Sequence, residues 1–258
     1  MKERTVPMEN VVRIETVLNF LNGWASPAYA EDWDNVGLLA GCMDTPVTKI
    51  MTALDISVPI IKQAVDFGAE LIISHHPVVF REIKHLYGNH PLYHLAMNQM
   101  AAIAVHTNMD RAPGGVNDVL AKHLGLRDIY TAQNGLLRIG TLEKEMEPAE
   151  LAALAGRLLD TPCGGIQWSD GGHPIKTVAV CSGAGGDYIE DLPDDVDAYL
   201  TGELHYHEWP LGSKRTFVAA GHYYTEVMIS KEMAARLAEA FPELSIAVAE
   251  ESCPYMVC

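Results

Sequence analysis

The hydrophobic pattern at the start of the chain switches between helical and extended spacing. Apolar residues recur at helical spacing over residues 11–21, which predicts an amphipathic core helix after the capping candidate Asn10. The apolar runs in KIMTALDI and AELIISHH predict buried strands. The segment between them, SVPIIKQAVDFG, has the pattern of a helix that stops at Gly68. The sequence therefore predicts the order helix, strand, helix, strand for this part of the chain.

The same alternation continues with a predicted helix over residues 91–100, a strand over 101–105 and a helix over 115–124. Strands that alternate with helices at this spacing are typical of a mainly parallel sheet covered on both faces. The first part of the chain is thus expected to have an α/β fold.

The rest of the chain predicts a second α/β half. We place the boundary between the halves near residue 128, giving domains 1–128 and 129–258, and expect the C-terminal part of the second to pack back on the first. The predicted elements are strands at 135–142, 164–168, 175–181, 197–200, 216–219 and 246–249, and helices at 148–159 and 222–241.

Composition narrows the function classes. The 258 residues carry 18 Lys and Arg against 34 Asp and Glu, a formal net charge of −16, which argues against nucleic acid or an anionic membrane as a partner. No apolar run approaches the length needed to span a bilayer, and the first residues lack the pattern of a secretory signal. We therefore expect a cytoplasmic protein. The five cysteines are scattered without a CxxC motif, so chemistry is expected from the eleven histidines instead.

The first histidine pair, His75 and His76, directly follows a predicted buried strand. The carboxyl ends of strands form the ligand crevice of an open α/β sheet. Neighbouring side chains in extended backbone point in opposite directions, so each imidazole can face a different metal ion. The alternative is a pair of histidines held by ordinary hydrogen bonds.

A second candidate group, His106 and Asp110, follows the strand over residues 101–105. Asp110 offers a hard oxygen ligand beside imidazole, and His106 is suited to be a ligand, a partner of a ligand or a proton carrier. The following residues, RAPGGVN, also fit a simple turn into the next helix.

A third group, His222 and Glu226, lies four residues apart in a predicted helix, so both side chains share one face. Alone, the pair would be read as an ordinary surface contact. Three such groups, each at the end of a strand, together favour a metal centre.

Two weaker features accompany these groups. The segment TGELHYHE contains His205 after another predicted strand, and we interpret it as lining of the site or as a second proton carrier. The glycine-rich run CSGAGG lacks the spacing of phosphate-binding loops, so we interpret it as a turn that allows close approach of another segment.

Together the segments DWDNVGLLAG, LDIS, GAELIISHHPVVF, VHTNMDRAPGGVND, YLTGELHYHE and GHYYTE resemble the NIF-three-like dinuclear metal-centre proteins. Members of that family are often named homologues of a type-two GTP cyclohydrolase I. The resemblance implies a three-layer α/β/α fold of two related, intertwined domains with mixed sheets. It also implies toroidal homo-hexamers, and five metal ligands that fall here on His75, His76, Asp110, His222 and Glu226.

The function implied is that of a dinuclear metal-binding protein, a hydrolase of the GTP cyclohydrolase kind with His106 and His205 as catalytic candidates. The alternatives are a metal-dependent phosphoesterase and a non-catalytic metal-handling or regulatory protein. A nucleotide or a phosphoester is the expected substrate. Imidazole and carboxylate ligands accept Zn, Mn, Fe, Co or Ni, so the residues do not name the two divalent ions.

Overall fold

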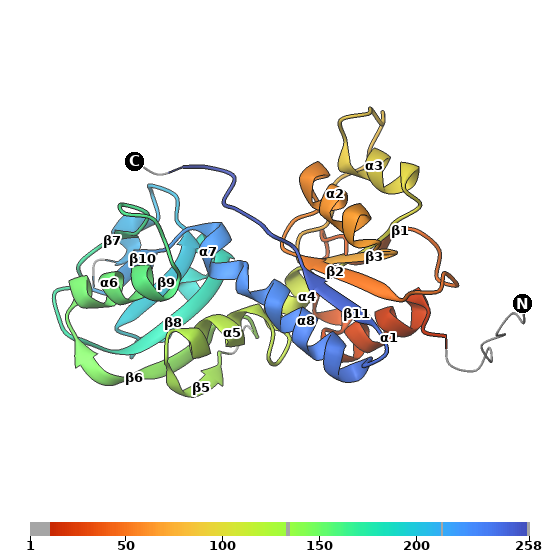
Figure 1. The fold of residues 1–258 in the computed structure, drawn as a ribbon. Helices are drawn as coiled ribbons and strands as arrows, with labels where there is room; N and C mark the ends of the chain where they lie inside the picture. Colours follow the sequence, from red (N-terminus) through yellow and green to blue (C-terminus); the bar gives the residue numbers. More distant parts are fainter. Residues whose placement is uncertain (1–10, 133–134, 213, 257–258) are drawn as a thin grey trace, which may run out of the picture. The chain divides into compact units, whose positions relative to one another are not determined.

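The computed structural model describes residues 11–132, 135–212 and 214–256. These residues form two compact units (Figure 1), and each is described by itself. Unit 1 comprises the described residues up to Asn108 together with Met233–Glu251. Unit 2 comprises those from Met109 to Glu232 together with the described residues after Glu251. The chain thus contributes to each unit twice.

Unit 1 is built on a five-stranded sheet with the order β1-β4-β3-β2-β11. The four strands from β4 to β11 run parallel, whereas β1 is antiparallel at one edge. The parallel strands are short and mostly apolar, which is typical of a sheet buried on both faces. The strands are β1 (Gly37–Ala40), β2 (Lys49–Ala53), β3 (Leu71–Ser74), β4 (Ala101–Ala104) and β11 (Ser245–Val248).

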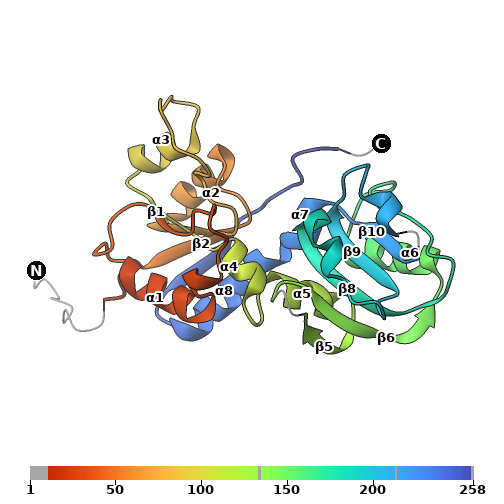
Figure 2. The same cartoon turned by 180° about the vertical axis from the view of Figure 1, so that it is seen from behind.

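Helices cover both faces of this sheet (Figures 1 and 2). Helices α2 and α3 pack on one face in a cluster with Met51 and Ile72, and α1 and α8 lie on the other. Phe20 of α1 meets Phe241, just after α8, at 5.4 Å between ring centroids. This layering confirms the expected α/β/α arrangement. The helices are α1 (Ile14–Trp24), α2 (Val58–Phe67), α3 (Pro91–Met97) and α8 (Met228–Ala240), and a short helix η2 (Pro27–Tyr29) follows α1.

The boundaries of these helices follow local chemistry. The Ser57 side chain accepts a hydrogen bond from the backbone N–H of Ile60 and caps α2, and Gly68 ends that helix in the left-handed conformation at φ 80°. Helix α1 begins at Ile14, after Arg13. The capping candidate Asn10 lies outside the described residues.

Unit 2 contains a mixed six-stranded sheet with the order β5-β6-β8-β9-β10-β7. Only β8, β9 and β10 run parallel, because β5, β6 and β7 pair antiparallel. The mixed sheets agree with the expected fold class. The strands are β5 (Arg127–Thr131), β6 (Arg138–Met146), β7 (Gln167–Trp168), β8 (Ile175–Ala184), β9 (Ala198–Glu203) and β10 (Thr216–Ala219).

The two faces of the unit 2 sheet are covered differently. Apolar residues of α5 and α6, such as Leu120 and Leu151, pack on one face. Ile189, Leu192 and Val196, from the segment around η3, pack on the other. The remaining elements are α4 (Thr107–Arg111), α5 (Val116–His123), α6 (Pro148–Leu158), η3 (Gly186–Asp191), η4 (Trp209–Gly212) and α7 (His222–Glu226).

The helix predicted over residues 222–241 is two helices, so that prediction was wrong in one detail. Helix α7 ends at Glu226 and α8 begins at Met228. The Thr225 hydroxyl donates to the carbonyl oxygen of His222 at 2.8 Å, and bonding of this kind competes with the helix ladder and bends helices. A five-residue helix therefore carries His222 and Glu226.

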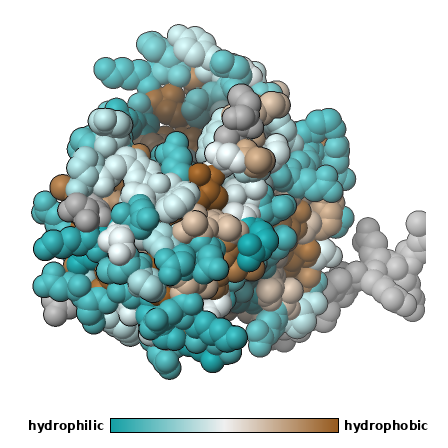
Figure 3. All heavy atoms as spheres, turned by 90° about the vertical axis from the view of Figure 1, so that its left-hand side faces the viewer, coloured by the Kyte–Doolittle hydropathy of each residue, from teal (hydrophilic) through white to brown (hydrophobic). Residues whose placement is uncertain are grey.

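On the face shown in Figure 3 hydrophilic residues predominate, and hydrophobic side chains gather only in small areas. Within the described ranges, we find no helix that is both long and apolar enough to cross a membrane.

Candidate metal centre

Three histidines of unit 1 lie at the carboxyl edge of its sheet. His75 and His76 directly follow β3, and His106 comes two residues after β4. Strands β3 and β4 are parallel neighbours, so their carboxyl ends meet at one edge. One ring nitrogen from each histidine lies within 4.8 Å of one from each of the others. The structure thus brings these three predicted site residues together.

Each imidazole of this histidine triad (His75, His76 and His106) is held through Nδ1. The Nδ1 atoms lie 2.9 Å from the Val105 carbonyl oxygen, 2.8 Å from Asp55 Oδ1 and 2.9 Å from Asp34 Oδ1, respectively. A carbonyl or an ionised carboxylate only accepts, so we assign the proton to Nδ1 in each ring. The Nε2 atoms then carry the lone pairs. Histidines that bind metals are typically anchored in this way.

Asp34 is the most constrained of these anchors. Its side chain is fully buried and also accepts from the backbone N–H of Thr107 at 3.0 Å and from the Thr107 hydroxyl. Burial alone would raise the pKa of Asp34, but the hydrogen bonds from His106 and Thr107 outweigh it and hold the pKa well below its usual range. Asp34 therefore stays ionised and fixes the His106 ring.

Unit 2 presents a second group, the carboxylate set of Asp110, His222 and Glu226. His222 Nε2 lies 3.0 Å from Glu226 Oε2, and its Nδ1 lies 3.3 Å from Glu203 Oε1. A carboxylate oxygen of Asp110 lies within 4.8 Å of one of Glu226. Glu226 is buried, so its carboxylate meets the Asp110 carboxylate on one side and the His222 imidazole on another where little water competes. Such a donor set fits a divalent cation.

Gly183 allows the backbone to approach the carboxylate set. A Cβ at this position would lie 2.3 Å from Glu226 Oε1 and 3.2 Å from His222 Nε2, and φ is +61°. Both the space and the left-handed conformation therefore require glycine. Gly183 lies within β8, so the glycine-rich run does allow the expected close approach of another segment, but at the end of the strand and not in a turn after it.

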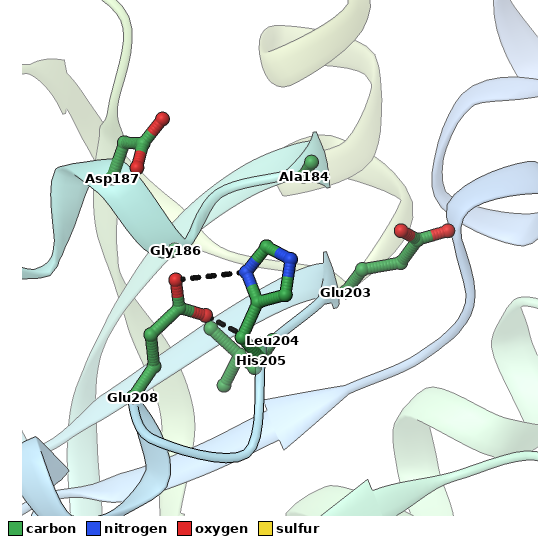
Figure 4. Close-up of a pocket in the computed structure, with 7 residues that line it drawn as sticks. All are labelled: Ala184, Gly186, Asp187, Glu203, Leu204, His205 and Glu208. Carbon is green, nitrogen blue, oxygen red and sulfur yellow. Dashed lines mark hydrogen bonds and ion pairs between the residues drawn. The ribbon is translucent and has the colours of Figure 1, made fainter.

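His205 follows β9 of unit 2. Its ring lines a pocket of about 100 Å³ with Asp187, Glu203 and Glu208 (Figure 4). Its side chain is 78% exposed, and Nδ1 lies 3.2 Å from Glu208 Oε1. Among the described residues, His205 belongs to none of the metal-capable groups. Its catalytic role stays a prediction.

Sequence reasoning did not identify Asp34, Asp55 and Glu203 as the carboxylates that contact the histidines, although Glu203 belongs to the segment TGELHYHE that was interpreted as lining of the site. Asp34 could not be paired with His106 from the sequence because the two residues are 72 positions apart. A usable signal existed for the other two, because Asp55 comes two residues after β2 and Glu203 is the last residue of β9. Acids at the ends of parallel strands deserve the same attention as histidines there.

Comparisons with known proteins agree with the fold. The family model described as Duf34/NIF3 (NGG1p interacting factor 3) matches residues 12–254. A GTP cyclohydrolase 1 type 2 homolog of Clostridium perfringens is 30% identical over 209 residues, covering 76% of this chain and 79% of that protein. One of Clostridium acetobutylicum is 28% identical over 246 residues, covering 86% of this chain and 90% of that protein.

The fold has solved counterparts as well. The crystal structure of a hypothetical protein of Staphylococcus aureus superposes with a TM-score of 0.89 at 24% identity, covering 96% of this chain and all of that one. This likeness concerns the fold alone. The family model spans nearly the whole described chain, and the resemblance that the motifs suggested is confirmed: this chain belongs to the Duf34/NIF3 family.

Proposed function

We propose that the chain is a dinuclear metal-binding protein that acts as a metal-dependent hydrolase. The ligands would be His75, His76, Asp110, His222 and Glu226. The observation that carries the proposal is the histidine triad, in which ring nitrogens of the three imidazoles lie within 4.8 Å of one another and every Nδ1 is held by an oxygen atom.

The residues fit a pair of divalent transition-metal ions. Imidazole suits Zn, Mn, Fe, Co and Ni, and the carboxylates of Asp110 and Glu226 add hard oxygen donors. Because Gly183 has no side chain, its backbone lies close to both the Glu226 carboxylate and His222 Nε2. When bound, such ions lower the pKa of water and polarise a substrate oxygen.

The chain's own residues supply the proton chemistry. The Asp34 carboxylate fixes the proton of His106 on Nδ1, so His106 Nε2 is the nitrogen that accepts or returns a proton. His205, held by Glu208, is the second candidate carrier. The His106 ring is ordered by a buried partner and His205 is largely exposed, so we favour His106.

The substrate class follows from the relatives that are named GTP cyclohydrolase 1 type 2 homologs. We propose hydrolysis of a nucleotide, with ring opening of GTP as the first case to test. A phosphoesterase would use the same ligands, and a metal-handling protein would use them without turnover. One experiment distinguishes the nucleotide hydrolase, the phosphoesterase and the metal-handling protein.

That experiment is metal analysis of freshly purified protein, followed by assays of GTP and a phosphoester panel. We expect about two ions per chain and turnover above that of the metal-free protein. His106→Ala should lower the rate and keep both ions, whereas His75→Ala should lose metal and rate together. Absence of turnover with all five metals would contradict the hydrolase and leave the metal-handling protein.

We also propose a homo-hexamer, which rests on family membership. Light scattering at micromolar concentration should then give a mass about six times that of the 28.2 kDa chain. A monomeric mass across that range would contradict it.

A further inference from the structure

Two aromatic side chains border the histidine triad. The ring centroids of Trp33 and Phe80 lie 6.1 and 5.4 Å from that of His106, with interplanar angles of 70° and 89°. Both rings meet the imidazole edge to face, a favourable arrangement for aromatic pairs. Trp33 is nevertheless 64% exposed and Phe80 49% exposed. Large aromatic surface is therefore left uncovered beside the candidate metal ligands.

Hydrogen bonds fix the two loops that carry these rings. Next to Trp33 in sequence, Asp34 holds His106, and the Glu31 backbone N–H donates to the Thr107 hydroxyl at 2.9 Å. Asn35 Nδ2 donates to the carbonyl oxygen of Val79, the residue before Phe80, at 2.6 Å. Trp33 and Phe80 thus stand on loops tied to each other and to the end of β4.

This arrangement differs from ordinary exposed apolar side chains. Single exposed hydrophobic residues are common and need no explanation. Here two exposed rings contact one imidazole, and that imidazole is held by a buried carboxylate. Aromatic faces presented on a fixed frame are the usual means by which proteins bind planar bases without reading their edges.

We propose that Trp33 and Phe80 bind a planar conjugated ring of the substrate beside the histidine triad. The inference rests on the proposed function and refines it, because it makes a heteroaromatic base, such as a nucleobase, a required part of the substrate. Phosphoesters without such a ring would bind weakly. The pair recognises ring faces, so it tolerates different bases.

The test is equilibrium binding to the protein as purified, by calorimetry. The probes are adenosine, guanosine, cytidine and uridine, with ribose 5-phosphate and inorganic triphosphate as ligands without a ring. We expect at least one nucleoside to bind at least tenfold tighter than ribose 5-phosphate. Trp33→Ala and Phe80→Ala should each weaken nucleoside binding about tenfold and leave triphosphate binding unchanged.

Matched variants separate ring stacking from loss of bulk or fold. Trp33→Phe should keep most of the affinity, whereas Phe80→Leu, which retains apolar volume without a π face, should behave like Phe80→Ala. Trp168→Ala removes another exposed tryptophan, 42% exposed in unit 2, and should change nothing. Metal content and circular dichroism of each variant check that the site and fold persist.

Two results would overturn the inference. One is nucleoside affinity that equals that of ribose 5-phosphate or is unchanged in Trp33→Ala and Phe80→Ala. The other is a change of oligomeric mass in these variants with unchanged nucleoside binding, which would make the rings a contact between copies of the chain. Neither result depends on turnover. A protein that stacks nucleosides through Trp33 but hydrolyses nothing would contradict the hydrolase and keep this inference.

Discussion

The histidine triad of unit 1 and the carboxylate set of unit 2 position their side chains in different ways. In the triad, each ring is held by an oxygen acceptor outside the group, and the rings follow buried strands. In the carboxylate set, both nitrogens of His222 face carboxylates, Glu203 and Glu226, and the histidine sits on a five-residue helix. Contacts with the rest of unit 1 therefore fix the orientation of the three rings of the triad. The carboxylate set concentrates negative charge that a bound cation would balance.

The largest effect on metal binding is expected from removing the most buried imidazole of the triad. His75 is fully buried, so His75→Ala should abolish metal binding, with a loss larger than the roughly 10–100-fold typical of an outer partner. Elemental analysis of the purified variant measures this. His94→Ala, which removes a partly buried histidine bonded to the Gly88 carbonyl, is the matched control and should retain metal. Equal metal content in both variants would refute the assignment.

The carboxylate set is tested through its glycine. Gly183→Ala should push Glu226 away and destabilise the protein by about 1–3 kcal/mol, because the new Cβ would overlap the carboxylate. Gly125→Ala is the control, since Gly125 also has a positive φ of +75° but nothing lies within 4 Å of its Cβ position. We expect metal loss in the first variant only. Metal titration and denaturant unfolding report the two effects. If Gly183→Ala and Gly125→Ala had the same metal affinity and stability, backbone strain alone would explain the need for glycine at position 183.

A milder change tests the anchoring of the triad. Asp55→Asn keeps the shape of the carboxylate that holds the proposed ligand His76 but removes its charge, so metal affinity should fall about 10–100-fold. The exposed Asp32 provides the control, and Asp32→Asn should leave the affinity unchanged. Competition with a fluorescent chelator measures both. A full loss of metal in Asp55→Asn would mean that metal binding depends on this anchor as strongly as on the ligands.

The smallest effect is expected at the amino ends of β2 and β3, the ends of these strands opposite to the histidine triad. Glu70 precedes β3 and accepts from the backbone N–H groups of Thr48 and Lys49. Burial raises its pKa, but these hydrogen bonds outweigh burial and leave the pKa below the reference value of 4.5. Its stabilisation is therefore complete above pH 4.5 and is lost as pH falls through the lower folded-state pKa.

Glu70→Gln should lower the free energy of unfolding by about 1 kcal/mol at neutral pH and by less in acid. Denaturant unfolding from pH 3 to 7 measures the difference, with metal content as the control for the distant site. A difference that grows in acid would contradict the assigned direction of the pKa.

The sequence was informative where local pattern and function coincide. Periodicity located the parallel strands of unit 1, and His75, His76 and His106 stood out because they follow such strands. It was uninformative where partners are distant, as for Asp34, whose role depends on a histidine 72 residues later. The end of α7 at Glu226 was not predicted because no glycine or proline marks it; the Thr225 hydroxyl donates to the His222 carbonyl at this point. Contacts made only in the folded chain decide such details.

Strand β11 has a consequence for the order in which the protein folds during synthesis. Its partner β2 is made almost two hundred residues earlier, and until residues 245–248 emerge β2 is an open sheet edge. Glu251 then accepts from the backbone N–H groups of Leu54 and Asp55, and Asp55 holds His76. The candidate metal ligand His76 thus reaches its final support only after the ribosome has added the residues up to Glu251, about 175 positions later in the sequence.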